Sequence, residues 1–155
     1  MQICASLVHE FSHAPARVFA EVTSLEGLPK TFTGFGPIPG VLRAEVVGGG
    51  ELREGATRRV HNSDGSAIDE VIEALRAPER HTYRLVRGFK PPFNLLVREA
   101  LSDWRFSPSA KGTRLEWSFT FTLTSPLAFP VTAPLVKVFF AKAMRRCVAN
   151  IEALL

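Results

Sequence analysis

Alternation of apolar and polar side chains marks the first predicted strand of this chain. Within residues 2–12, the side chains of Ile3, Ala5 and Leu7 begin one alternating apolar face that continues to Phe11. Six later segments have the composition and the turn boundaries of strands. These are residues 41–47, 56–62, 67–76, 81–88, 97–106 and 114–123. The pattern therefore predicts seven strands, and hairpin connections between them favour an antiparallel sheet.

Two further segments have helical periodicity. In residues 131–154, apolar side chains recur at steps of three and four, with Lys, Arg and Glu on the other faces. This segment would form a helix of about 24 residues, roughly 36 Å long. A shorter helix is expected from Pro15 to about Leu25, because proline suits the first helical turn. Residues 26–40 are rich in Gly and Pro and have room for a second short helix before a loop.

The order of elements is one strand, one or two short helices, six strands and one long helix. A sheet of hairpin-connected strands has one dry face, and the long helix is the element that can cover it. We therefore expect an α+β fold, with residues 1–155 forming a single domain. A curved sheet around one helix cannot fill all the space between them, so a cavity is expected.

Composition narrows the possible partners. The chain has 12 Phe and one Tyr, and phenylalanine rings suit a dry interior or the wall of an apolar cavity. The net charge is +4, but the basic residues are spread along the chain. Their tightest cluster is Lys137, Lys142, Arg145 and Arg146. No segment interleaves aromatic and basic residues, so we expect no nucleic-acid partner.

The cysteines and histidines show no pattern of a metal site. Cys4, Cys147 and the four histidines lack the spacing of metal ligands, and no cofactor motif is present, so no metal or cofactor is expected. The N-terminus lacks the pattern of a signal peptide, which indicates a cytoplasmic protein. The most apolar region, residues 127–143, contains Pro130, Pro134 and Lys137, so no membrane-spanning segment is expected.

Several residues mark the boundaries of the predicted elements. They are Phe11, Pro15, Val18-Phe19, Gly55-Ala56-Thr57-Arg58-Arg59, Asp64-Gly65, Glu70, Tyr83, Trp104-Arg105-Phe106 and Gly112-Thr113-Arg114-Leu115-Glu116-Trp117. With the element order, they resemble the START/Bet v 1-like (SRPBCC) superfamily, of the polyketide cyclase/dehydrase and lipid-transport type. The resemblance implies a helix-grip fold, in which a curved seven-stranded antiparallel sheet wraps around the long C-terminal helix and two short helices follow the first strand. It also implies a cavity for sterols, lipids, polyketides, plant hormones or aromatic compounds.

The Asp64-Gly65 turn allows the strand register to be estimated. If these two residues form the centre of a hairpin turn, Arg59 lies opposite Glu70, and a similar estimate for the next hairpin places Arg87 there too. The three charged side chains would then share the concave face with Ile68, Ile72, Ala74, Tyr83 and Leu85. A buried carboxylate between two guanidiniums is satisfied. A slip of one residue would instead place the cluster on the solvated face.

If the register estimated from the two-residue turn is correct, the charged cluster orients the polar end of a ligand, or moves protons in an enzyme. Arg59, Glu70 and Tyr83 are then the candidate catalytic residues. Aromatic residues of the last strands and of the long helix either touch the ligand or pack the core. The candidate ligand-binding residues are Arg59, Ile68, Glu70, Ile72, Tyr83, Leu85, Arg87, Trp104, Trp117, Phe119 and Phe140.

Three functions remain open on the sequence alone. The first is the binding or transport of a small apolar or aromatic metabolite or lipid between the sheet and the C-terminal helix. The second is a polyketide cyclase or dehydratase that needs no metal or cofactor. The third is a protein-interaction module that uses the C-terminal helix, and the apolar segment 127–140 also offers a surface for a homodimer.

Overall fold

The strand pattern of the sequence produces one antiparallel sheet. The computed structural model describes residues 1–155 and contains seven strands in the order β1-β7-β6-β5-β4-β3-β2. The strands are β1 (Gln2–Phe11), β2 (Val41–Val46), β3 (Thr57–Asn62), β4 (Ala67–Arg76), β5 (Arg80–Arg87), β6 (Val97–Pro108) and β7 (Thr113–Leu123). Neighbours in sequence pair from β2 to β7, and only β1 crosses the molecule, to pair with β7. The predicted α+β class and the seven strands are confirmed.

Two short helices follow β1, as expected. Helix α1 (Pro15–Thr23) starts with proline in its first turn and buries Val18, Phe19 and Val22, and α2 (Leu28–Thr31) forms one more turn. A third short helix, α3 (Phe93–Leu96), follows the Pro91-Pro92 pair before β6 and was not predicted.

The C-terminal helix is longer than the sequence pattern indicated. It runs from Pro126 to Leu154, 29 residues in all. Its parts are η1 (Pro126–Ala128), α4 (Phe129–Pro134), the π-helical turn η2 (Leu135–Phe140) and α5 (Ala141–Leu154). The early start has a local cause, because the Ser125 hydroxyl accepts a hydrogen bond from the Leu127 N–H at 3.0 Å and caps the helix.

Pro130 and Pro134, which led us to expect no membrane-spanning segment, lie within this helix and do not break it. Pro130 lies in the first turn of α4, where no N–H is needed, and the π-helical turn directly after Pro134 absorbs its missing hydrogen bond. By length and composition the helix is therefore able to cross a membrane, with a mean hydropathy of 1.4 over its most apolar window. In this fold, one face of the helix packs against the sheet instead, through Met144, Cys147 and Ile151.

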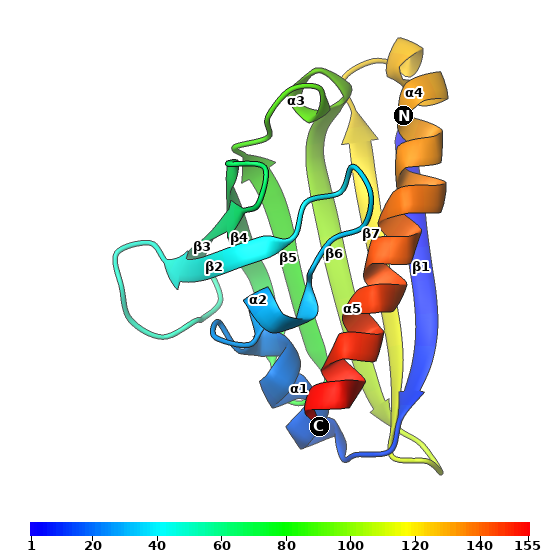
Figure 1. Cartoon of the computed structure of the whole chain (residues 1–155). Coiled ribbons are helices and arrows are strands. Elements are labelled where there is room, and N and C mark those ends of the chain that lie inside the picture. The colour runs from blue at the N-terminus through cyan, green and yellow to red at the C-terminus, as the bar shows by residue number, and fades with distance from the viewer.

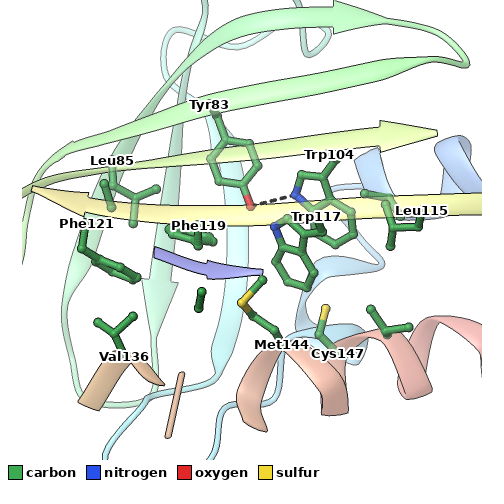
Figure 2. Close-up of a cluster of buried hydrophobic side chains, with 14 of the residues drawn as sticks. Tyr83, Leu85, Trp104, Leu115, Trp117, Phe119, Phe121, Val136, Met144 and Cys147 are labelled. Carbon is green, nitrogen blue, oxygen red and sulfur yellow. Dashed lines mark hydrogen bonds between the residues drawn. The ribbon is translucent and has the colours of Figure 1, made fainter. Parts of the chain in front are cut away.

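The core lies between the concave face of the sheet and the helices. Figure 1 shows the long helix running across one side of the sheet, with α1 and α2 beside its C-terminal end. Every second residue of β7 is buried, and these side chains face the helix. Figure 2 shows the indoles of Trp104 and Trp117, stacked with their ring centroids 3.7 Å apart, beside Met144 and Cys147 of the helix. Strand alternation and helical periodicity thus build one shared core.

The hairpin between β3 and β4 has a longer turn than the sequence predicted. Asn62 donates its N–H to the Ser66 carbonyl at 2.9 Å, so the loop contains three residues. Gly65 takes a positive φ of 84°, and the Asp64 carboxylate accepts hydrogen bonds from the Ser66 N–H and hydroxyl. This loop shifts the register by one residue, and Arg58 rather than Arg59 lies opposite Glu70. The predicted register of this hairpin is therefore wrong.

The next hairpin also departs from the estimate. Irregularities in the β4–β5 pairing place Ile72 opposite Tyr83 and Glu70 opposite Leu85. The pairing there differs from the estimated register by two residues. Because side chains alternate between the two faces, a shift of two leaves these residues on the faces that we predicted. A further irregularity next to Glu70 places Arg87 opposite Asp69, on the outer face.

Candidate functional site

A pocket of about 120 Å³ lies between the sheet and the helical layer. Thirteen of its twenty lining residues are hydrophobic. Six of them are phenylalanines from the end of α2, the β5–β6 connection, β7 and the long helix: Phe32 directly after α2, Phe89, Phe93, Phe119, Phe121 and Phe140. The Phe140 ring stands edge-on to Phe119 and Phe121, with centroids 4.7 and 4.9 Å away. The wall is thus mainly aromatic and dry.

A buried ion pair forms the polar part of this wall. Arg58 on β3 places its Nε and Nη2 atoms 2.7 Å from the same oxygen of Glu70 on β4. Their side chains are only 2% and 9% exposed, a depth at which a charge persists only with a partner. The other carboxylate oxygen of Glu70 has no hydrogen-bond partner in the protein, although Glu70 lines the pocket. The pocket therefore has one free carboxylate oxygen on a mostly apolar wall.

The two charges of this pair affect each other's ionisation. Burial raises the pKa of the Glu70 carboxyl above its ordinary value, against the opposing charge of Arg58. Burial also disfavours the Arg58 cation, but the charge of Glu70 and the neighbouring Tyr83 outweigh it and raise the pKa of Arg58. The guanidinium therefore stays charged throughout the ordinary pH range.

Tyr83 completes this polar corner of the pocket. The Arg58 guanidinium carbon lies 4.6 Å from the centroid of the Tyr83 ring, a cation–π distance. The Tyr83 hydroxyl accepts a hydrogen bond from Trp104 Nε1 at 3.4 Å, as Figure 2 shows. Burial and the charge of Glu70 raise the pKa of Tyr83. The phenol therefore remains protonated at neutral pH and keeps its O–H as a donor.

His81 lies next to this corner, deeper in the core. Its ring centroid is 5.0 Å from that of Tyr83, and its Nδ1 is 3.3 Å from the Ala74 carbonyl. That contact requires Nδ1 to donate, so Nε2 carries the lone pair, and it is buried with no partner. Burial and the charge of Arg58 lower the pKa of His81 to about 3. The imidazole is neutral under ordinary conditions.

The residues 32–40 cover one side of the pocket and are fastened to the long helix. Ile38 and Pro39 line the pocket. The Phe35 ring lies 4.9 Å from the Arg146 guanidinium carbon and 5.3 Å from Lys142 Nζ. Arg146 also donates to the Gly34 carbonyl at 3.2 Å. Two members of the basic cluster noted in the sequence, Lys142 and Arg146, thus hold this loop in place.

The structure brings about half of the predicted ligand-binding residues to the pocket. Those in its lining are Ile68, Glu70, Tyr83, Leu85, Phe119 and Phe140. Ile72, Trp104 and Trp117 are buried in the core outside the pocket lining. Of the three candidate catalytic residues, Glu70 and Tyr83 line the pocket and Arg59 does not.

The predicted trio of Arg59, Glu70 and Arg87 does not form. Arg59 and Arg87 point outward, where both donate to Asp69 at 2.8 and 2.7 Å, and their side chains are 40% and 71% exposed. For Arg59 the cause is the three-residue β3–β4 loop, which exchanges the faces of Arg58 and Arg59. For Arg87 it is the irregularity next to Glu70 in the β4–β5 pairing. Arg59, Asp69 and Arg87 form an ion-pair cluster on the outer face, in which two exposed guanidiniums cover a buried carboxylate. The pair that lines the pocket is Arg58 and Glu70.

Sequence reasoning missed Arg58 and the polar rim of the pocket. The rim includes Asn62, Asp64 and Ser66 of the β3–β4 hairpin, and Lys90, whose Nζ donates to the Asp64 carbonyl at 3.3 Å. The Asp64-Gly65 signal located the hairpin correctly. A signal for the three-residue loop was also present, because Ser66 directly follows Asp64-Gly65 and bonds back to the Asp64 carboxylate.

Solved structures share this architecture. Ara h 8.0201 matches with a TM-score of 0.72 at 18% identity, over 99% of this chain and 97% of that one. The major latex-like protein 151 of Panax ginseng matches at 0.73 and 13% identity, again over 99% and 97%. A protein from Mesorhizobium loti matches at 0.70 and 12% identity, over 98% and 96%. At such identities the likeness shows the fold, and it confirms the expected Bet v 1-like helix-grip architecture.

Sequence comparison places the chain in a family. No curated protein matches it. A family model described as polyketide cyclase / dehydrase and lipid transport matches residues 2–155, nearly the whole chain. With the shared fold, this match shows that the chain belongs to the polyketide cyclase / dehydrase and lipid transport family.

Proposed function

We propose that this protein binds a small apolar or aromatic molecule that carries one hydroxyl group, and that it stores or transports this ligand. The family implies a hydrophobic ligand. The observation that carries the proposal is the pocket itself, a mostly apolar wall rich in phenylalanine that contains one buried ion pair, Arg58 and Glu70. Mostly apolar pockets with a few placed polar groups are the usual form of small-molecule sites.

The size of the pocket limits the ligand. Its volume of about 120 Å³ is close to that of an apolar cavity that takes up benzene, about 150 Å³. Without any movement, the pocket therefore accommodates a group of about one aromatic ring. A longer ligand is accommodated when residues 32–40 move outward, because Phe32, Ile38 and Pro39 belong to the lining.

The polar group of the ligand follows from the hydrogen bonding of Glu70. One of its oxygens accepts both bonds from Arg58, and the other is unpaired. A ligand that donates a hydrogen bond to this oxygen, inside a mostly apolar pocket, gains affinity over one that leaves it unpaired. The pair as a whole is neutral, which favours a neutral hydroxyl over an ammonium group.

Native mass spectrometry of protein purified without detergent tests this function. We expect an adduct that disappears on denaturation, and organic extraction followed by mass analysis should identify a hydroxylated apolar or aromatic compound. A clean apo mass, with no uptake from a library of such compounds, would contradict the proposal. Uptake that persists when Phe119 is changed to Trp, which fills the pocket, would also contradict it, because the ligand would then lie elsewhere.

A second candidate is a cyclase or dehydratase, and one specific observation favours it. Glu70 and Tyr83 have raised pKa values and flank the same guanidinium at one corner of the pocket. Such convergence is typical of sites that transfer protons. Turnover of an aromatic polyketide chain that is lost in Glu70→Gln would support this candidate. If the protein binds such a compound without converting it, the result supports the carrier function instead.

A further inference from the structure

One end of the molecule carries an exposed apolar patch outside the pocket. We name it the end patch and define it as Leu95 of α3, Leu127 of η1, and Phe129 and Val131 of α4. Leu127 is 89% exposed and Leu95 69% exposed. Contiguous exposed apolar residues mark interaction surfaces.

Two segments far apart in the sequence form this patch. Thr124 donates its N–H to the Leu96 carbonyl at 3.0 Å and its hydroxyl to the Leu95 carbonyl at 2.7 Å. These bonds fix α3 beside the start of the long helix, and α3 packs against α4. Figure 1 shows both elements at the same end of the sheet, away from α1 and the C-terminus. The end patch is therefore a fixed surface and not a set of isolated side chains.

The two segments carry positive charge only. No Asp or Glu occurs between Glu79 and Glu99, or between Glu116 and Glu152. Lys90 and Arg98 flank α3, and Lys137 follows α4. Glu99, the nearest acidic residue after α3, is paired with Arg84 at 3.4 Å. An apolar surface bordered by cations matches an anionic lipid surface, into which Leu and Phe insert while Lys and Arg meet the head groups.

The same charges argue against a second copy of the chain as the occupant. A symmetric dimer through the end patch would bring the segments around α3 and α4, which carry positive charge only, of both copies toward one another. Such like-charge contacts are costly at an interface. The hydrophobic side chains alone do not decide between a membrane and a dimer, but the charges around them do.

The end patch also borders the pocket. Phe93 belongs to α3 and lines the pocket, two residues before Leu95. Phe140 of the long helix lines it as well. A lipid surface that contacts α3 and α4 therefore lies next to an aromatic wall of the pocket. We propose that the end patch docks the protein on anionic membranes, where an apolar ligand is taken up or released.

Vesicle flotation tests this docking. The probes are vesicles of phosphatidylcholine alone and of phosphatidylcholine with phosphatidylserine. We expect binding to the anionic vesicles, weaker binding at high salt, and little binding to the neutral ones. The variant Leu127→Ser/Phe129→Ser should lower the affinity by about tenfold or more. The matched control is Leu42→Ser, which removes a leucine that is 63% exposed on β2, on another part of the surface.

The other outcomes overturn the proposal. Equal vesicle binding by the double-serine variant and by Leu42→Ser would place the contact elsewhere, and no binding to anionic vesicles would exclude docking. A dimer in analytical ultracentrifugation that the double-serine substitution dissolves would identify a second copy as the occupant. Docking does not use the ion pair of the pocket, so the variant Arg58→Met/Glu70→Leu should still bind vesicles even if it no longer binds the ligand. Circular dichroism spectra check that each variant is folded.

Discussion

Arg58 and Glu70 lie opposite each other on neighbouring strands, with two guanidinium nitrogens 2.7 Å from one carboxylate oxygen. Each charge is stable at this depth because the other is present. The arrangement leaves one carboxylate oxygen free at the wall of an aromatic pocket. The pair thus links the stability of the sheet to the recognition of a ligand.

Removal of one member of the pair should be more harmful than removal of both. Glu70→Leu leaves the Arg58 charge buried without a partner, and we expect a loss of about 3–5 kcal/mol in the free energy of unfolding. Arg58→Met/Glu70→Leu keeps similar volumes without charge and should be close to wild type. Urea unfolding measures these differences. As a control, Arg59→Met removes a half-exposed guanidinium on the outer face and should lower the free energy of unfolding much less than Glu70→Leu does.

The free oxygen of Glu70 should produce a preference for hydroxylated ligands. We expect the wild type to bind 2-naphthol about tenfold or more tightly than naphthalene, because only the alcohol donates a hydrogen bond. In Arg58→Met/Glu70→Leu the preference should disappear, while naphthalene still binds. Fluorescence titration measures both affinities. The same preference in the double variant would show that another group receives the hydroxyl.

The fold was predictable from the sequence because its signals are local and repeated. Alternation marked the strands, and Asp64-Gly65 located a hairpin. The helix start at Pro126 was less accessible, because it depends on the cap from Ser125 and on a π-helical turn after Pro134. Such features override the usual rule that prolines end helices.

The site was predictable only in part, because its polar centre depends on strand register. Glu70 and Tyr83 were placed on the correct face, whereas one extra loop residue exchanged Arg59 for Arg58. Register follows from turn geometry, and a two-residue and a three-residue loop are both compatible with Asp64-Gly65. His81 was not predicted to matter, since its depressed pKa arises from burial beside Arg58, a contact that spacing in the chain does not reveal.

His81 should make the protein sensitive to acid. Its pKa is about 3 in the folded chain, against an ordinary value of 6.5, so the unfolded chain binds the extra proton between these limits. Its contribution to stability is therefore complete above about pH 6.5 and is lost as the pH falls toward 3, by up to about 1.4 kcal/mol per pH unit. His81→Phe removes this titration. Urea midpoints between pH 7.5 and 4 should fall more steeply for the wild type, and parallel curves would contradict the assignment.

The loop of residues 32–40 should control how fast a ligand leaves. Its Phe35 is held by Arg146, through the ring contact at 4.9 Å and the bond to the Gly34 carbonyl, so loss of this side chain loosens the cover of the pocket. We expect Arg146→Ala to raise the dissociation rate of 2-naphthol several-fold, with a smaller change in affinity because entry is faster too. Arg145→Ala is the matched control, since Arg145 is exposed on the same helix and makes no hydrogen bond to the loop. Stopped-flow displacement measures the rates. If both variants release the ligand at the wild-type rate, the ligand leaves by another route, and the end beside α3 becomes the portal to examine.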